Sequence, residues 1–209
     1  MPTMTLELEA TLKRAEDYAR SHKQEYIVTE TILLALLDDK DAAGALNEFD
    51  VDIQRLRQSL ESYHTENLED IRLPQEPEIL LVTAGADRAM QRARLQAQAF
   101  GIENISGINL LAAILSEQQS YAAYYLAQQH FSRIDAVSYA RGHRPKEEER
   151  KRAQEQNAES LLSQWIYNAF PKDPHYTPGI VEPLCRDKSL QDEIKALVRA
   201  RVGRPFNTP

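Results

Sequence analysis

Apolar side chains recur at helical spacing through most of the first 142 residues of the chain. The first stripe has four members at intervals of four, three and four residues: Leu8, Leu12, Ala15 and Ala19. Residues 32–37 are apolar on all sides and follow Thr29, so we expect a buried helix with Thr29 as its N-cap. Residues 51–63 carry apolar positions of a further amphipathic helix.

The same pattern occurs twice in the chain. Residues 29–37 match residues 106–114 at a constant offset of 77 positions, and the preceding helices align at nearly the same offset. Val51 and Phe131, 80 positions apart, open comparable closing helices. Such self-similarity indicates a duplicated unit whose halves cannot bury their apolar helices alone.

These observations predict an all-α fold built from two four-helix repeats related by a pseudo-twofold axis. The repeats cover about residues 4–66 and 79–142, and an acidic segment with prolines, residues 67–77, links them. We therefore assign residues 1–142 to one domain, which is large enough for an independent core.

The composition changes after Gly142. Residues 145–156 mix both charges without an apolar stripe, and we interpret residues 143–160 as a charged, flexible tether, with a solvated helix as the alternative. Two short apolar segments follow around a proline-rich stretch, and they offer too little apolar surface for a second core. We interpret residues 161–209 as the beginning of a longer structural unit.

Charge and composition narrow the function. Residues 1–142 carry 22 acidic and 13 basic side chains, a net charge of −9, while residues 143–209 carry +2. An acidic body argues against nucleic-acid binding and favours a protein or a cationic partner. We expect a soluble, cytoplasmic protein without a membrane segment, because neither a leader nor a long apolar run is visible.

Candidate chemistry is sparse. Cys185 is the single cysteine, and the five histidines lack the spacing of a metal site, so we predict no metal and no cofactor. No Gly-x-x-x-x-Gly-Lys-Ser/Thr loop occurs, so the chain itself is not expected to hydrolyse ATP or to be an enzyme.

Several strings resemble the Clp N-terminal repeat domain of AAA+ unfoldases, most closely that of ClpA-type subunits. Residues 22–26 read His-Lys-Gln-Glu-Tyr, and residues 116–124 read Ser-Glu-Gln-Gln-Ser-Tyr-Ala-Ala-Tyr, where the family usually has Ser-Glu-Gln-Glu-Ser-x-Ala-Ala-Tyr. The resemblance spans residues 4–142. Residues 180–190 are similar to the string that opens the first ATPase module, although Cys185 stands where the family has Ile-Gly before Arg. The resemblance thus implies that residues 161–209 begin an incomplete AAA+ module.

The resemblance also implies partners and a site. It implies docking of the small adaptor ClpS and of protein substrates, and contact with a Clp ATPase ring and peptidase only as part of a longer chain. The positions that match the family's docking surface are Glu25, Glu30, Leu80, Thr83 and Arg88. The alternative is that Glu25 and Glu30 lie at helix ends and only stabilise the helices there, because carboxylates interact favourably with the helix dipole.

Other interpretations stay open at this stage. The chain is either a fragment of a ClpA-like subunit or a free-standing relative that regulates by competing for the adaptor. Two acidic pockets related by the repeat would favour direct recognition of clients, for example through phosphorylated arginine. Gly107 aligns with Glu30 in the second half, which breaks that symmetry and counts against this interpretation. A small helical enzyme with acid/base residues between the halves would need a convergent titratable cluster, which the sequence does not show.

Overall fold

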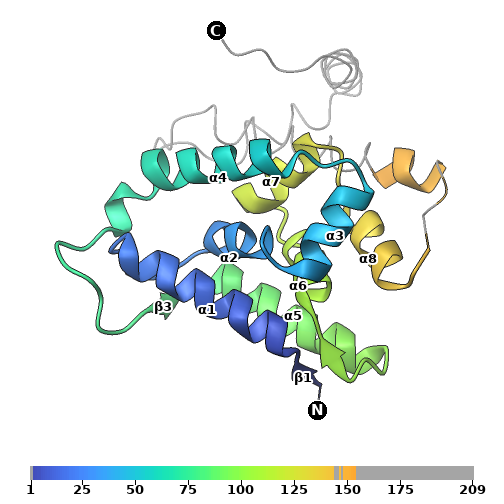
Figure 1. Cartoon of the computed structure of the whole chain (residues 1–209), viewed down its shortest axis with the longest axis horizontal. Helices are drawn as coiled ribbons and strands as arrows, with labels where there is room; N and C mark the ends of the chain where they lie inside the picture. The colour runs from blue at the N-terminus through green and yellow to red at the C-terminus, as the bar shows by residue number, and fades with distance from the viewer. Residues whose placement is uncertain (1, 144–145, 147, 154–209) are drawn as a thin grey trace, which may run out of the picture. The chain divides into compact units, whose positions relative to one another are not determined.

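The computed structural model describes residues 2–143, 146 and 148–153. The described part is almost entirely helical (Figure 1). Its α-helices are α1 (Leu6–Ser21), α2 (Thr29–Leu36), α3 (Lys40–Glu48), α4 (Ile53–Asn67), α5 (Ala84–Ala99), α6 (Gly107–Ile114), α7 (Tyr121–Gln128) and α8 (Arg133–Ala140). A 3₁₀ turn covers Glu69–Ile71, and the strands are β1 (Thr3–Met4), β2 (Tyr26–Ile27), β3 (Leu81–Val82) and β4 (Asn104–Ile105). The predicted all-α class and the duplicated four-helix unit are confirmed.

The first helix of each half follows from capping and a stripe of small or apolar residues. The Thr5 hydroxyl accepts the N–H of Leu8 at 3.1 Å, and the Thr83 hydroxyl accepts the N–H of Ala86 at 3.5 Å. Each side chain thereby satisfies a backbone donor that the first helical turn leaves free. The buried positions are Leu8, Thr11, Ala15 and Ala19 in α1, and Ala86, Ala89, Ala93 and Ala97 in α5. The two sets are 78 positions apart, one more than the sequence predicted.

The offset of 77 was wrong because the sequence was aligned on two hydroxyl side chains, Thr29 and Ser106. Ser106 is the N-cap of α6, but Thr29 lies inside the first turn of α2, whose N-cap is Val28. Glu30 therefore corresponds to Ile108 and not to Gly107. The offset becomes 80 at Val51 and Phe131, as predicted, after a loop that is longer in the second half.

Two short parallel ribbons, which the sequence did not predict, join the halves. Strand β1 pairs with β4, and β2 pairs with β3. In each pair, the strand before the first helix of one half lies beside the strand after the first helix of the other half. The exchange is reciprocal, so the ribbons obey the same pseudo-twofold relation as the helices.

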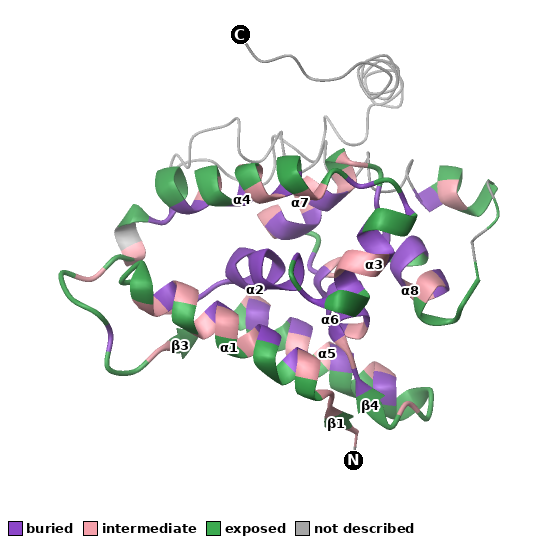
Figure 2. Ribbon diagram, in the orientation of Figure 1, coloured by how far each residue is buried: buried purple, intermediate pink, exposed green. Residues whose placement is uncertain are grey.

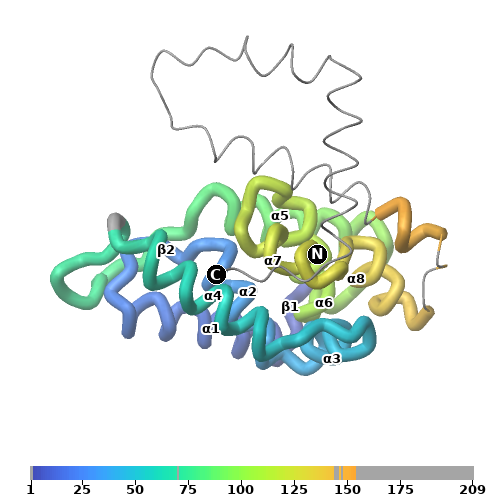
Figure 3. The backbone as a smooth tube through the Cα atoms, turned by 90° about the horizontal axis from the view of Figure 1, so that it is seen from above, coloured from blue at the N-terminus to red at the C-terminus, as the bar shows by residue number. Residues whose placement is uncertain are grey.

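The core forms around α2 and α6, which contact each other at the centre of the described helical domain (Figures 1 and 3). Every residue of α2 is buried, and so is nearly all of α6 (Figure 2). Helix α3 packs on α6 while α7 packs on α2, so each half covers the central helix of the other. Neither half encloses its own apolar helix, which agrees with the prediction from the repeat.

Gly107 is required by this close packing. A Cβ atom at residue 107 would collide with the carboxylate of Asp39. Asp39 is buried, caps α3 through the N–H groups of Asp41 and Ala42, and accepts a hydrogen bond from the Thr11 hydroxyl at 2.8 Å. The start of α6 thus approaches the start of α3 closely enough to exclude any side chain at residue 107.

The segment after residue 142 differs from the predicted flexible tether in its described part. Residues 148–153 are helical, and Arg150 forms an ion pair with Asp135 on α8. The rest of the predicted linker, residues 154–160, and the predicted start of an ATPase module, residues 161–209, lie outside the described residues. Among the described helices, none has the length and apolarity needed to cross a bilayer.

Candidate functional site

The β2–β3 ribbon brings together residues that are more than 50 positions apart in the sequence. The Leu81 N–H donates to the Glu25 carbonyl at 3.0 Å, and the Thr83 N–H donates to the Ile27 carbonyl at 3.1 Å. The Thr83 hydroxyl also lies 3.3 Å from the Ile27 carbonyl. Glu25, Leu80 and Thr83, all expected at the site, therefore lie at one edge of the described domain.

Glu25 has a fixed backbone and a partly exposed side chain. Its N–H donates to the Ile71 carbonyl at 2.9 Å, and its own carbonyl accepts the Leu81 N–H across the ribbon. The preceding Gln24 is buried, and its amide nitrogen lies 2.9 Å from Nδ1 of buried His64. Burial lowers the pKa of His64, proximity to His22 and Arg72 acts in the same direction, and the backbone of Glu30 raises it. The resulting pKa is about 4. A neutral imidazole therefore supports the segment that carries Glu25.

Glu30 does not lie on the surface, contrary to the sequence-based expectation. Its side chain is only 5% exposed, and its carboxylate accepts the N–H of Ala122 at 3.0 Å. Burial raises the pKa of the Glu30 carboxyl, while the backbone N–H groups of Glu30, Ala122 and Tyr121 act in the opposite direction. Glu30 therefore holds the start of α7, a helix of the other half, and is not available for direct contact with a partner.

Arg88 is exposed but already engaged by a carboxylate. Its guanidinium donates from Nε (3.0 Å) and Nη2 (2.8 Å) to one oxygen of Glu117, and Arg92 donates to the other oxygen at 2.8 Å. Although burial alone raises the pKa of Glu117, the hydrogen bonds from Arg88 and Arg92 hold it below its usual value. The guanidinium of Arg88 is thus fixed in direction on the outer face of α5, one turn beyond Thr83.

The exposed apolar side chains of the site are only partly the ones that the sequence suggested, Leu80 and Val82. Leu80 is only partly exposed and packs against the core. Its neighbours Ile79, Leu81 and Val82 are 74%, 43% and 41% exposed. Ile79 and Leu81 could not be recognised from the sequence, because four consecutive apolar residues do not reveal which ones face outward. We call the set Glu25, Ile79, Leu81, Val82, Thr83 and Arg88 the β2–β3 surface.

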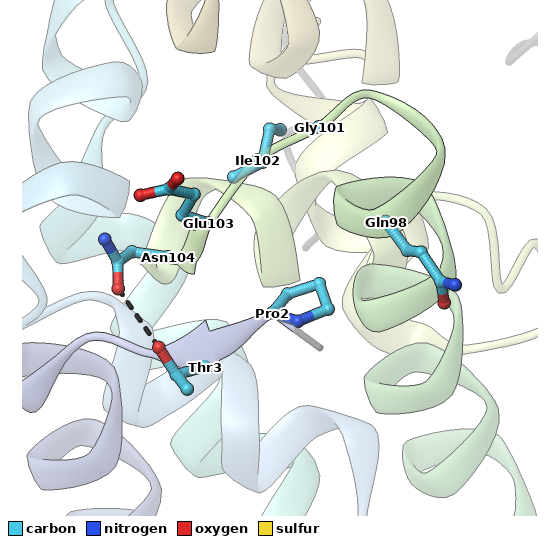
Figure 4. Close-up of a pocket in the computed structure, with 7 residues that line it drawn as sticks. All are labelled: Pro2, Thr3, Gln98, Gly101, Ile102, Glu103 and Asn104. Carbon is cyan, nitrogen blue, oxygen red and sulfur yellow. Dashed lines mark hydrogen bonds between the residues drawn. The ribbon is translucent and has the colours of Figure 1, made fainter.

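The other ribbon carries a polar counterpart. A pocket beside β1 and β4 is lined by Pro2, Thr3, Gln98, Gly101, Ile102, Glu103 and Asn104 (Figure 4). The Thr3 hydroxyl donates to the Asn104 side-chain oxygen at 3.1 Å across the ribbon. Glu103 is the repeat counterpart of Glu25, and Gly101 is that of Lys23, with left-handed φ angles of 67° and 58°. The backbone is therefore repeated, whereas the exposed apolar side chains are not.

Within the described residues, no group of three or more His, Cys, Asp or Glu side chains could hold a metal ion.

The three tyrosines of α7 pack on one another and against Tyr63 of α4. These rings are half-buried and form a packed cluster. The arrangement at the β2–β3 surface is suited to binding a polypeptide.

Sequence comparison agrees with this picture. The family model described as the Clp repeat (R) N-terminal domain matches residues 3–129. A ClpA homolog protein from Fuscovulum blasticum is 28% identical over 223 aligned positions, which cover 99% of this chain. The chain spans 28% of that relative's length.

Solved structures show the same fold. The N-terminal domain of Hsp104 from Candida albicans matches with a TM-score of 0.57 and 12% identity, over 66% of this chain and 89% of that domain. A chain from structural work on a malarial protein secretion system matches with a TM-score of 0.58 and 12% identity, over 67% and 94% of the two chains. At such low identity these matches establish the architecture alone.

Proposed function

Because the chain belongs to the Clp repeat N-terminal domain family, we propose that it docks an adaptor similar to ClpS, together with protein substrates, for delivery to an ATP-dependent Clp protease. The family is one of protein-interaction domains, and the similarity to a ClpA homolog supports the more specific role. The chain's own contribution is binding and positioning, since its sequence contains no phosphate loop.

The observation that carries the proposal is the side-chain composition of the β2–β3 surface. Ile79, Leu81 and Val82 offer apolar area that is free for burial, and Glu25, whose carbonyl pairs with the Leu81 N–H, adds a partly exposed carboxylate. Partners gain affinity from buried apolar anchors, whereas charged groups around them direct orientation and discriminate against wrong partners. The adaptor expected here presents a cationic side chain to Glu25 and an apolar side chain to Leu81 and Val82.

Tethering would increase the effect of binding. We assign residues 143–160 to a linker and residues 161–209 to the start of a first AAA+ module, in a cytoplasmic protein. The match to the ClpA homolog extends over 99% of the chain, which supports continuity with such a module. A linker keeps the bound cargo at a high local concentration near the ring.

Direct recognition of unfolded clients is a second candidate, and the exposed Ile79, Leu81 and Val82 favour it. An unfolded model protein offers many apolar segments but lacks a folded docking face. Charge reversal at Glu25 should therefore weaken adaptor binding much more than binding of the unfolded protein.

A titration of the 209-residue chain with a purified ClpS-like adaptor tests the proposal. We expect Glu25→Lys to raise the Kd about tenfold or more, because it replaces attraction by repulsion at the edge of the surface. The matched control is Glu103→Lys, which makes the same change at the repeat-related position and should leave the Kd unchanged. Equal affinity of the two variants, or no binding by the unaltered chain, would contradict the proposal.

A further inference from the structure

Strand β3 is the outer strand of the β2–β3 ribbon. The segment that carries β2 is bonded on one side to β3. On its other side it is bonded to the residues that follow the 3₁₀ turn, where the Leu73 N–H donates to the Lys23 carbonyl at 2.7 Å. Both residues of β3 are exposed (Figure 2). A further strand could therefore be added only beside β3.

The backbone groups of Val82 point to this open edge. The N–H groups on either side of it, those of Leu81 and Thr83, donate to carbonyls of the β2 segment at 3.0 and 3.1 Å. In a parallel pair, successive residues of a strand direct their backbone groups to opposite edges, so those of Val82 point away from β2. Among the described residues, no backbone hydrogen bond outside the ribbon uses the Val82 N–H or carbonyl. Val82 thus offers one donor and one acceptor to another chain.

The other ribbon has the same open edge but different side chains. The Thr3 and Thr5 N–H groups donate to the β4 segment at 3.0 and 2.9 Å, so Met4 between them is the repeat counterpart of Val82. Met4 is only partly exposed and packs against the core. A strand added beside β1 would therefore gain little apolar burial, whereas one added beside β3 would cover Leu81 and Val82.

Charge adds a second preference. The carbonyl of Glu25 pairs with the Leu81 N–H, and its carboxylate is partly exposed. Residues 1–142 together carry a net charge of −9. A segment with a basic side chain is therefore attracted to this edge and an acidic one is repelled. Backbone pairing gives affinity to any extended segment, while these side chains select among segments.

We infer that the partner docks in extended form, as a third strand added to the open edge of β3. One of its carbonyls accepts the Val82 N–H, and one of its N–H groups donates to the Val82 carbonyl. Its apolar side chains cover Leu81 and Val82, and a basic side chain pairs with Glu25. This inference rests on the proposed function and specifies that the adaptor binds through an extended segment.

Amide exchange of the 209-residue chain, measured by NMR with and without a saturating ClpS-like adaptor, tests the pairing. In the free chain, the Val82 N–H should exchange with water faster than those of Leu81 and Thr83, which are bonded within the ribbon. Adaptor binding should slow the exchange at Val82 about tenfold or more, because its N–H then donates to the added strand. The Met4 N–H, at the related edge of β1, is the internal control and should be unaffected.

Two variants at Val82 separate the backbone from the side chain. Val82→Pro removes the outward N–H and keeps most of the apolar area, and proline is tolerated in an edge strand whose N–H faces solvent. Val82→Ala keeps the N–H but removes more apolar area. We expect Val82→Pro to raise the Kd for the adaptor about tenfold, and Val82→Ala to raise it by no more than about threefold. Urea unfolding establishes that both variants remain folded.

The possible outcomes separate this inference from the proposed function. Unchanged exchange at Val82 in the complex, or a greater loss of affinity in Val82→Ala than in Val82→Pro, would overturn the strand pairing and leave the proposed docking intact. Absence of adaptor binding by the unaltered chain would overturn the proposed function, and this inference with it.

Discussion

Glu25 and Glu103 occupy the same position in the two halves of the domain. Each carbonyl accepts a backbone N–H at 3.0 Å, from Leu81 for Glu25 and from Thr3 for Glu103. Their surroundings differ, because Glu25 pairs through its backbone with exposed Leu81, whereas the pocket at Glu103 combines polar Thr3, Gln98 and Asn104 with Pro2, Gly101 and Ile102. The duplicated scaffold thus presents two different surfaces.

The apolar part of the β2–β3 surface should be needed for binding. Leu81→Asp should weaken adaptor binding by about tenfold to a hundredfold, because a charge replaces apolar area that a partner covers. The control is Leu95→Asp. Leu95 is also exposed but lies on α5 and is not part of the β2–β3 surface, so this variant should bind the adaptor normally. Titration calorimetry compares the two variants, and similar losses in both would show that the effect is not specific to this surface.

Gly107→Ala should destabilise the domain strongly. The added Cβ atom would overlap the Asp39 carboxylate, and moving Asp39 would disturb both the α3 cap and the bond to Thr11. We expect a loss of about 2–4 kcal/mol in the free energy of unfolding, measured with urea. Gly85→Ala is the control. A Cβ atom at residue 85 would lie 3.3 Å from its nearest neighbour, Thr29 Oγ1, so this variant should change the free energy of unfolding by less than about 1 kcal/mol. A mild effect at residue 107 would mean that the contact between α6 and α3 is looser than described.

Glu30 should contribute to stability, with no direct role in adaptor contact. Glu30→Ala removes the carboxylate that accepts the Ala122 N–H, and should cost about 1–2 kcal/mol. Glu30→Gln keeps an oxygen acceptor and avoids a buried charge, so it should cost less. Urea unfolding at pH 7 measures both. Stability unchanged in Glu30→Ala, with adaptor binding lost, would instead assign Glu30 to the interface.

His64 should make stability depend on pH. Its pKa is about 4 in the folded domain and near 6.5 when unfolded, so the unfolded chain binds a proton more readily between these values. The stability that His64 contributes should be complete above pH 6.5 and decline by about 3 kcal/mol as the pH falls to 4. His64→Gln should remove this component.

The informative quantity is the difference between His64→Gln and the unaltered chain, measured by urea unfolding across pH 4–7. Burial raises the pKa of Glu30, which acts with the opposite sign, because the folded state then binds the proton more readily as the pH falls. The difference between variants cancels that effect. A difference that does not vary with pH would contradict the described burial of His64.

Much of the architecture could be predicted because helical periodicity and an internal repeat are local properties of the sequence. Leu8, Ala15 and Ala19 are buried as their spacing indicated. The ribbons could not be predicted, because two-residue strands such as β2 and β3 form only when the halves dock. Their residues carry no alternation long enough to read.

The site was predicted less completely, for reasons of packing. The resemblance marked Glu25, Thr83 and Arg88, which the structure leaves exposed or partly exposed. It also marked Glu30, whose burial depends on α7, more than 90 positions away. The docking of Arg150 on Asp135 was likewise invisible, since a segment rich in both charges shows no preference for any one partner.

The most direct test of the account maps the adaptor onto the two ribbons. Backbone amide resonances of the isotopically labelled chain are followed by NMR while a ClpS-like adaptor is added. The account predicts shifts concentrated at residues 25–27 and 79–83, with residues 3–4 and 101–105 unperturbed. Shifts centred on the β1–β4 pocket, or equal shifts at both ribbons, would contradict it.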